Sequence, residues 1–269
     1  MISAIGFVGA FISGILLGLM GGGGSILTVP ILVYLFKMEP VHATGYSLFI
    51  VGVSSLLGSF RYFIQKNVNF KIALVFGLPS IISVYTTRKV LLPLLPDVFF
   101  SIGTFHFTKN LALMIVLSVL MLGTSFYLIY IDSKKGEMHQ ASNVRYTRLA
   151  LQGLMVGLLT GLVGIGGGFL IVPALIIFAR LPMKVAVGTS LLLIAVNSSF
   201  GFAGELMAAE TMQWAMLLKI TAVTMTGVFT GIFISKFIPG EKLKPAFGWL
   251  LLCVGAYILT MEIWMSHVL

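Results

Sequence analysis

Long runs without a charged residue alternate along the chain with short segments that carry the lysines and arginines. A helix needs about 20 apolar residues to cross the hydrocarbon core of a bilayer. Most of the uncharged runs can therefore span a membrane, and the runs 1–36 and 149–179 are too long for one crossing. The pattern predicts an all-α polytopic membrane protein with no soluble domain. The uncharged runs are residues 1–36, 111–131, 149–179, 185–204, 220–235 and 246–260.

Composition and charge support this class. Of the 269 residues, 58% are hydrophobic and 9% are charged, whereas soluble proteins carry about 25% charged residues. The net charge of +9 lies on loops between apolar runs and not on one basic face, which indicates topological charge and no nucleic-acid partner. We expect a multi-pass protein of a cell membrane, the bacterial inner membrane, with the lipid bilayer as its surroundings.

The chain contains two copies of one unit. A shift of 143 positions places Gly18 on Gly161, Pro30 on Pro173 and Gly58 on Gly201, and many intervening residues are identical. We therefore divide the chain into a first transmembrane repeat (1–131), a polar linker (132–148) and a second transmembrane repeat (149–269). Each repeat is expected to open with a glycine-broken segment followed by three helices. These segments are 1–36, 42–63, 71–95 and 109–131, and 149–179, 184–206, 213–238 and 245–265.

The distribution of basic residues bears on the direction of the two repeats. With eight plain crossings the Lys and Arg residues divide almost evenly between the two faces, which gives no orientation. If each glycine-broken segment enters and leaves by the same face, the repeats are inverted and both termini lie outside. The linker face, expected to be cytoplasmic, then holds twelve basic residues against Lys37, Arg88, Lys89 and Lys109; the twelve are Arg61, Lys66, Lys71, Lys134, Lys135, Arg145, Arg148, Arg180, Lys184, Lys236, Lys242 and Lys244.

The glycine clusters are the main candidate for chemistry. Four glycines run from Gly21 to Gly24, and the second repeat has Gly164 and 166–168. Glycine costs about 1 kcal/mol in a helix interior, so the helix should break there and a second short helix should begin. The first amides of that helix and its positive dipole end can hold an anion. The candidate donors are the amides of Gly23, Gly24, Ser25 and Ile26, and of Gly166, Gly167, Gly168 and Phe169.

Small residues can instead serve close helix packing. That interpretation suits Gly14, Gly18, Gly157 and Gly161, which are spaced four apart. It suits three or four successive glycines less well, because these cover every face of the turn.

The helix after each break carries a polar stripe. Ser47, Ser54, Gly58 and Arg61 fall on one helical face, and their repeat partners are Ser190, Asn197, Gly201 and Gly204. These groups could bind a solute or could bond a neighbouring helix. The amide of Asn197 is the strongest single candidate, because its NH2 can donate to an anion.

The paired motifs "GLMGGGGSILTVPIL" and "GLVGIGGGFLIVPAL", followed by "ATGYSL" and "AVGTSL", resemble the TauE/SafE family of sulfite and organosulfonate exporters. The resemblance covers both repeats. It implies transport of a small, sulfur-containing oxyanion such as sulfite, thiosulfate or an organosulfonate.

The leading functional hypothesis is a secondary transporter that holds a small anionic substrate between the two glycine breaks and works by alternating access. An anion channel with the same pocket is the alternative. An intramembrane enzyme is not expected, since H-E-x-x-H and G-x-S-x-G are missing from the sequence, and we expect no cofactor and no metal. A gradient of substrate or of a coupling proton or ion would supply energy, and an oligomer is compatible with the sequence.

Overall fold

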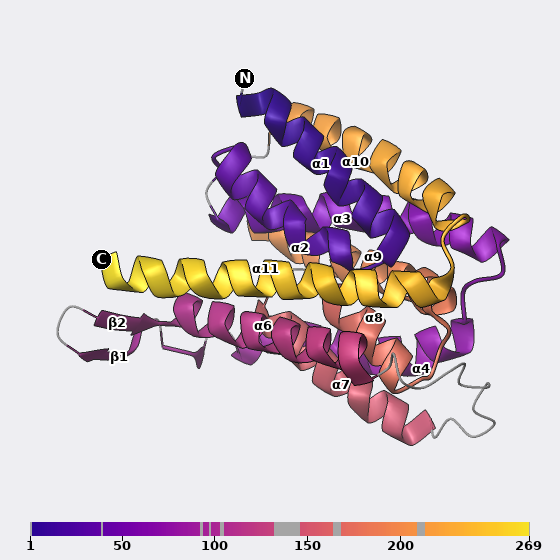
Figure 1. Cartoon of the computed structure of the whole chain (residues 1–269). Coiled ribbons are helices and arrows are strands. Elements are labelled where there is room, and N and C mark those ends of the chain that lie inside the picture. Colours follow the sequence, from indigo (N-terminus) through magenta and orange to yellow (C-terminus); the bar gives the residue numbers. More distant parts are fainter. Residues whose placement is uncertain are drawn as a thin grey trace.

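A computed structural model describes residues 2–38, 40–91, 94–96, 98–102, 105–131, 146–163, 168–208 and 213–268. The described chain is a bundle of helices with one small hairpin (Figure 1). The predicted first repeat contains α1 (Ile2–Met20), α2 (Gly23–Pro30), α3 (Pro40–Ile64), α4 (Phe70–Thr86) and α6 (Lys109–Phe126), with π-helical turns η1 (Ile31–Leu35), η2 (Thr87–Leu91) and η3 (Tyr127–Ile131). The predicted second repeat contains α7 (Tyr146–Val163), which begins within the predicted linker, α8 (Gly168–Ile177), α9 (Met183–Ala208), α10 (Trp214–Ser235) and α11 (Gly240–Val268).

The first glycine-broken segment folds back on itself. α1 ends at Met20, and α2 with η1 returns along α1. A Cβ placed on Gly9 would lie 3.2 Å from Cδ1 of Leu35, and one placed on Gly6 would lie 2.7 Å from the ring of Phe36. The segment therefore folds back toward the start of α1, as the glycine cluster predicted, and does not form one continuous crossing of the bundle. In the second repeat, α7 ends at Val163 and α8 begins at Gly168.

The first long helix of each predicted repeat, α1 and α7, packs on a helix of the other repeat. α1 runs parallel to α10, because Gly14 lies against Thr224 and Gly18 lies against Val228. α7 likewise runs parallel to α4, because Gly153 lies against Phe76 and Gly157 against Ser80. A Cβ at any of these glycines would meet backbone of the facing helix. Close helix packing is thus confirmed for Gly14, Gly18 and Gly157. At Gly161 a Cβ would meet the Thr87 side chain at 2.8 Å and Cα of Val84 at 3.2 Å.

Equivalent helices of the two repeats meet in antiparallel pairs. In the pair formed by α3 and α9, Leu48 lies beside Gly201 and Gly58 lies beside Leu191. The pair formed by α6 and α11 has the same sense, since Gly248 lies beside Ile129 and Gly255 beside Met121.

The bundle has two ends that differ in content. The termini end holds the starts of α1 and α10 and the end of α11, and in Figure 1 it lies on the left. The linker end holds the ends of α3, α6 and α10 and the starts of α7 and α11. Two contacts define them: Tyr46 accepts a 2.6 Å bond from the amide of Gln213 at the termini end, and the Lys71 ammonium lies 4.6 Å from the Tyr146 ring centroid at the linker end.

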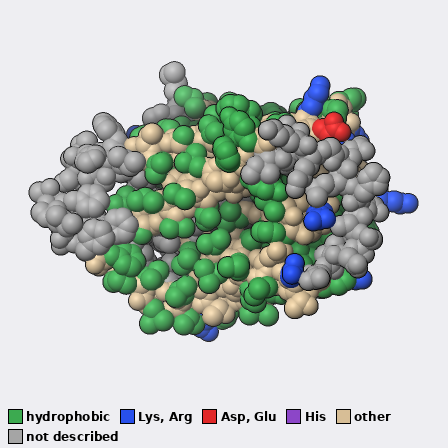
Figure 2. Space-filling view, turned by 60° about the horizontal axis from the view of Figure 1, so that its bottom comes forward, with side chains coloured by type: hydrophobic (Ala, Val, Ile, Leu, Met, Phe, Trp, Pro, Cys, Tyr) green, Lys and Arg blue, Asp and Glu red, His purple; other side chains and the backbone are tan. Residues whose placement is uncertain are grey.

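Within the part of the chain that the structure describes, five helices are long and apolar enough to cross a membrane: Gly45–Ile64, Phe70–Leu91, Met183–Ala203, Trp214–Ser235 and Gly240–Met261. Their outer faces carry exposed apolar side chains such as Leu56, Leu78, Ile82 and Phe233, as expected where lipid is the solvent. On the visible face of Figure 2, hydrophobic side chains cover the middle and most Lys and Arg side chains lie toward the right.

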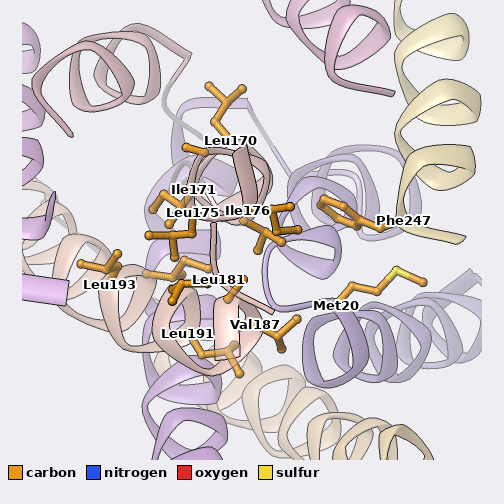
Figure 3. Packing of buried hydrophobic residues seen from close by; sticks show 14 of the residues in the cluster. Met20, Leu170, Ile171, Leu175, Ile176, Leu181, Val187, Leu191, Leu193 and Phe247 are labelled. Carbon is orange, nitrogen blue, oxygen red and sulfur yellow. The ribbon is translucent and has the colours of Figure 1, made fainter. Parts of the chain in front are cut away.

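The core centres on α8. Leu170, Ile171, Leu175 and Ile176 of this short helix are buried. Figure 3 shows them packed among side chains of α9, with Met20 of α1 and Phe247 of α11 beside them. A half-length helix buried on all sides has its backbone shielded from lipid, which is the condition for a chain break at membrane depth.

A two-stranded antiparallel hairpin was not foreseen from the sequence. β1 (Val98–Ile102) pairs with β2 (Phe105–Thr108), with Val98 opposite Thr108 and Ile102 opposite Phe105. The Thr108 hydroxyl then accepts a 3.3 Å bond from the Leu111 amide and so caps α6. The third segment, predicted as 71–95, is described as helix from α4 through the π-helical turn η2 to Leu91.

Candidate functional site

The first break lies at Gly21 and Gly22. Gly21 has φ +73°, a left-handed conformation that glycine adopts without strain. Its amide donates to Leu17 O at 2.8 Å, and the Gly22 amide donates to Met20 O at 2.9 Å. The chain thereby turns sharply at the end of α1 and starts α2 at Gly23.

The start of α2 leaves three amides without a partner inside the helix. These belong to Gly23, Gly24 and Ser25, the first three residues of α2. The prediction for Ile26 was wrong, because Ile26 is the fourth residue of α2 and its amide faces the carbonyl of Gly22 in the helical ladder. No side chain caps α2 at Gly22.

The starts of α2 and α8 meet. A Cβ placed on Gly168 would lie 2.9 Å from Oγ of Ser25, 3.0 Å from Cα of Gly22 and 2.7 Å from Cδ1 of Ile194. Ser25 and Gly168 are repeat equivalents, so each helix presents the same position to the other. Two helix N-termini, each with a positive dipole end, are therefore brought together.

The same face of α9 borders both helix starts. A Cβ on Gly21 would lie 2.5 Å from Oγ of Ser190 and 3.2 Å from Cα of Val187. Ile194, one turn further along α9, touches the Gly168 position. Asn197 follows one turn after Ile194 and continues this face.

Two predicted site residues are buried without a hydrogen-bond partner. Asn197 is 6% exposed, and neither its Nδ2 nor its Oδ1 has a partner. Its repeat equivalent, Ser54, is fully buried, and its Oγ also lacks a partner. A buried polar group left unsatisfied costs about 1–3 kcal/mol, so a bound solute or water that hydrogen-bonds these two side chains would be stabilising.

The other predicted residues take different positions. Gly24 lies against Ser13 and Leu17 of α1, and a Cβ on Gly23 would lie 2.9 Å from Cδ2 of Leu250. Both glycines thus also serve close packing.

Ser190 is buried and donates to Val187 O at 2.8 Å, and Ser47 is buried at the equivalent position of α3. Gly166 and Gly167 lie outside the described residues. Arg61, the last residue of the predicted polar stripe on α3, is exposed at the linker end of this helix.

Tyr62 belongs to the break and was missed in the sequence. It is 1% exposed, and its hydroxyl donates to Gly18 O at 3.0 Å and lies 3.3 Å from Ser235 Oγ. The Gly18 carbonyl would normally accept from the Gly22 amide, but that amide bonds Met20 O instead. Tyr62 therefore replaces a helical bond lost at the turn. Nothing at the sequence level marks this tyrosine, because its partners are distant in the chain.

Ser13 and Thr28 hold the two arms of the hairpin together. The Ser13 hydroxyl donates to Gly24 O at 2.9 Å and lies 3.1 Å from Thr28 Oγ1, which donates to the same carbonyl at 3.2 Å. The carbonyl of the first turn is thereby occupied, and the free groups at the start of α2 are donors. A site with free donors suits an anion.

The buried polar side chains of the described residues are serines, threonines and Asn197. Among those residues, no group of three His, Cys, Asp or Glu side chains could hold a metal ion. Negative charge at the break would therefore be met by peptide amides, hydroxyls and an amide side chain.

Membrane-spanning helices around a pair of broken, half-length segments define a polytopic membrane transporter. A family model described as "Sulfite exporter TauE/SafE" matches residues 6–258, and the chain belongs to this family. Curated relatives carry the same kind of name. The chain is 29% identical over 240 residues to "Probable membrane transporter protein YdhB" of Bacillus subtilis (strain 168), covering 88% of this chain and 91% of the relative.

A "Probable membrane transporter protein" of Xylella fastidiosa (strain Temecula1 / ATCC 700964) is 29% identical over 251 residues, covering 91% of this chain and 90% of the relative. "Probable membrane transporter protein MJ0441" of Methanocaldococcus jannaschii is 29% identical over 203 residues, covering 74% and 70%. No solved structure matches the chain significantly. The protein is thus a multi-pass membrane transporter of the TauE/SafE family, and the resemblance expected from the glycine motifs is confirmed.

Proposed function

We propose that the protein is a secondary transporter of a small, sulfur-containing oxyanion, such as sulfite, thiosulfate or an organosulfonate, with its site at the junction of α2 and α8. The observation that carries this proposal is the meeting of the two helix starts, where Ser25 Oγ lies 2.9 Å from a Cβ position on Gly168. The family description names sulfite export, and an oxyanion fits a site made of hydrogen-bond donors.

The binding energy would come from neutral groups. The amides of Gly23, Gly24 and Ser25 point out of the start of α2, and the two helix dipoles each contribute about half a positive charge. Asn197 and Ser54 add donors that have no other partner. Such interactions strengthen when water is excluded, because the local dielectric constant falls.

We also propose that the two repeats are inverted. Helices related by the internal repeat, α3 with α9 and α6 with α11, contact each other antiparallel. A two-fold axis that relates antiparallel neighbours is perpendicular to them, and hence lies in the membrane plane. This is the symmetry found in many secondary transporters.

The packing suggests which parts move. One bundle contains α1, α2, α3 and α10, and the other contains the equivalent α7, α8, α9 and α4. The α2/α8 junction and the α3/α9 crossing lie between these bundles. Rocking of one bundle against the other would open the junction first to one end and then to the other, which is alternating access.

The linker end is proposed to be cytoplasmic. Arg61, Lys66, Lys71, Arg148 and Lys236 are exposed there, while Lys37 and Lys89 are exposed at the termini end. Basic residues are enriched on the cytoplasmic side of membrane proteins. Both termini would then face outward.

The test is an anion panel on the detergent-purified protein. Sulfite, thiosulfate, sulfoacetate, sulfate and small carboxylates are each added, and the melting temperature Tm is recorded. A ligand at about 100 times its Kd adds about 2.7 kcal/mol, equivalent to a Tm rise of roughly 5–10 °C for a chain of this size. The anion that raises Tm should be taken up saturably by proteoliposomes and exchanged against unlabelled solute.

Asn197→Leu provides the site variant and Ser199→Ala the control, because Ser199 on the same helix donates to Ala195 O at 2.7 Å. We expect Asn197→Leu to lose the Tm response and uptake and Ser199→Ala to keep both. Equal responses from both variants would refute the site. Electrical currents far above transporter turnover would instead identify a channel.

A further inference from the structure

Buried hydroxyls of this bundle normally bond a carbonyl of their own helix. Ser59 Oγ donates to Leu56 O at 2.7 Å, Ser190 Oγ to Val187 O at 2.8 Å and Thr224 Oγ1 to Ile220 O at 2.9 Å. Serine and threonine do this because a carbonyl one turn back is always within reach. The same bond is made by the buried Thr160, Thr221 and Ser235.

Four side chains near the α3/α9 crossing make no such bond. Ser54, Ser55, Asn197 and Ser198 are buried and make no hydrogen bond. Among the described residues seven buried side-chain atoms lack a partner, and five of them belong to these four residues. Each unsatisfied group costs about 1–3 kcal/mol. The rotamer of a single side chain does not explain why four unsatisfied residues occur at one crossing.

The four residues are related by the internal repeat. Ser54 is equivalent to Asn197 and Ser55 is equivalent to Ser198. They lie where α3 and α9 cross, since Gly52 is packed against Cβ of Ser198 at 3.2 Å and the contacts Leu48–Gly201 and Gly58–Leu191 lie on either side. The crossing is near the middle of both helices. Two equivalent positions on each helix therefore present unbonded polar atoms at mid-membrane depth.

We propose that Ser55 and Ser198 are further substrate-binding residues, and that with Ser54 and Asn197 they bind the uncharged, hydrogen-bonding part of the transported solute. This assignment rests on the proposed function. The α2 and α8 starts hold the charged group, and Asn197, one turn beyond Ile194 on the same face of α9, connects the two parts of the site. These polar atoms have no partner within the protein because the bound solute supplies their hydrogen-bond partners.

The chemistry of Asn197 limits the solute class. Both the donor Nδ2 and the acceptor Oδ1 are without partners, and the serine hydroxyls can donate or accept. A solute made only of acceptor oxygens leaves Oδ1 unpaired. The site therefore favours an oxyanion that also carries a hydroxyl or amino donor, such as a hydroxy- or amino-substituted sulfonate.

The test uses the full-length purified protein and two probes, ethanesulfonate and 2-hydroxyethanesulfonate, which differ by one hydroxyl. Affinity is measured by isothermal titration and by Tm shift for wild type, for Ser55→Ala/Ser198→Ala and for the control Ser59→Ala/Ser199→Ala. The control removes two hydroxyls of the same two helices, and each of these hydroxyls already donates to a carbonyl of its own helix. Wild type should bind the hydroxylated probe about tenfold more tightly than ethanesulfonate, as one good hydrogen bond contributes.

The affinity of the double variant Ser55→Ala/Ser198→Ala for the hydroxylated probe should be at least about tenfold lower than that of wild type. Its Tm without ligand should equal or exceed that of wild type, because unsatisfied buried hydroxyls have been removed. The control should keep wild-type affinity. Wild-type affinity in the double variant would overturn the assignment of Ser55 and Ser198, and equal wild-type binding of both probes would overturn the donor requirement. If wild type responds neither to any anion of the panel nor to either of the two sulfonates, the proposed function itself fails and this inference falls with it.

Discussion

The hydrogen bond from Tyr62 to the end of α1 can be tested by removing one oxygen. Tyr62→Phe leaves the ring in place but deletes the hydroxyl that donates to Gly18 O at 3.0 Å. The Gly18 carbonyl then has no helical donor, because the Gly22 amide bonds Met20 O. A buried unsatisfied acceptor costs about 1–3 kcal/mol, and interhelical bonds in membranes contribute up to about 1.7 kcal/mol. We therefore expect a loss of about 1–2 kcal/mol.

The assay is thermal unfolding of the purified protein without ligand. A loss of about 1–2 kcal/mol lowers Tm by roughly 2–8 °C in a chain of this length. Ser235→Ala should have the smaller effect, because Tyr62 keeps its bond to Gly18 O. Tyr257→Phe is the matched control, since Tyr257 is half exposed on α11. A Tyr62→Phe protein that melts with wild type, or no lower than Tyr257→Phe, would show that the turn does not need this bond.

Three further outcomes are expected. Gly14→Val should prevent folding, because the Cβ at residue 14 would meet the Thr224 backbone. The measurement is the loss of monodisperse protein after extraction. The control Gly123→Val should be tolerated, because a Cβ at Gly123 meets nothing within 4 Å. Single cysteines at position 140 and at the C-terminus, in a Cys253→Ala background, should be labelled from opposite faces of the membrane; labelling from the same face would reject inverted repeats. Ser13→Ala should lower Tm by roughly 2–4 °C through the lost bond to Gly24 O, and an unchanged Tm would show that this bond does not hold the hairpin.

Much of the fold was predictable because lipid imposes simple rules on sequence. Runs of about 20 apolar residues can only be helices in a bilayer, and the repeat offset showed that Gly18 and Gly161 hold the same place. The exchange of helices between repeats was not predictable. Glycine spacing at Gly14 and Gly18 indicates a close-packed partner, but it does not say that the partner is α10 of the other repeat. The β hairpin was missed because its residues read as a loop between apolar runs.

The candidate site was only partly predictable for a related reason. The break at Gly21 follows from local backbone preference, and the placement of Ser54 and Asn197 follows from helical periodicity. Whether a buried hydroxyl is free depends on its rotamer and its neighbours. Ser54 and Ser59 look alike in the sequence, yet Ser59 bonds Leu56 O and Ser54 bonds nothing.

A test of the junction between the two helix starts needs a variant that blocks anion binding without disrupting the packing of the helices. A bulky side chain at Gly24 does not do this, because it would strike the Ser13 backbone and displace α1 whether or not an anion binds there. Gly168→Ala places a methyl group 2.9 Å from Ser25 Oγ, 2.7 Å from Ile194 Cδ1 and 3.0 Å from Gly22 Cα. Adding Ile194→Ala removes the second contact and leaves the methyl group between the two helix starts.

We expect the double variant Gly168→Ala/Ile194→Ala to insert and to elute as wild type does, but to lose the Tm response to the anion that stabilises wild type. Ile194→Ala alone is the control for the loss of a buried side chain, which costs about 2–5 kcal/mol in a core. It should melt lower than wild type and still respond to the anion. If the double variant keeps the response of its parent, an added methyl group between α2 and α8 does not compete with the solute. The anion would then bind elsewhere in the protein.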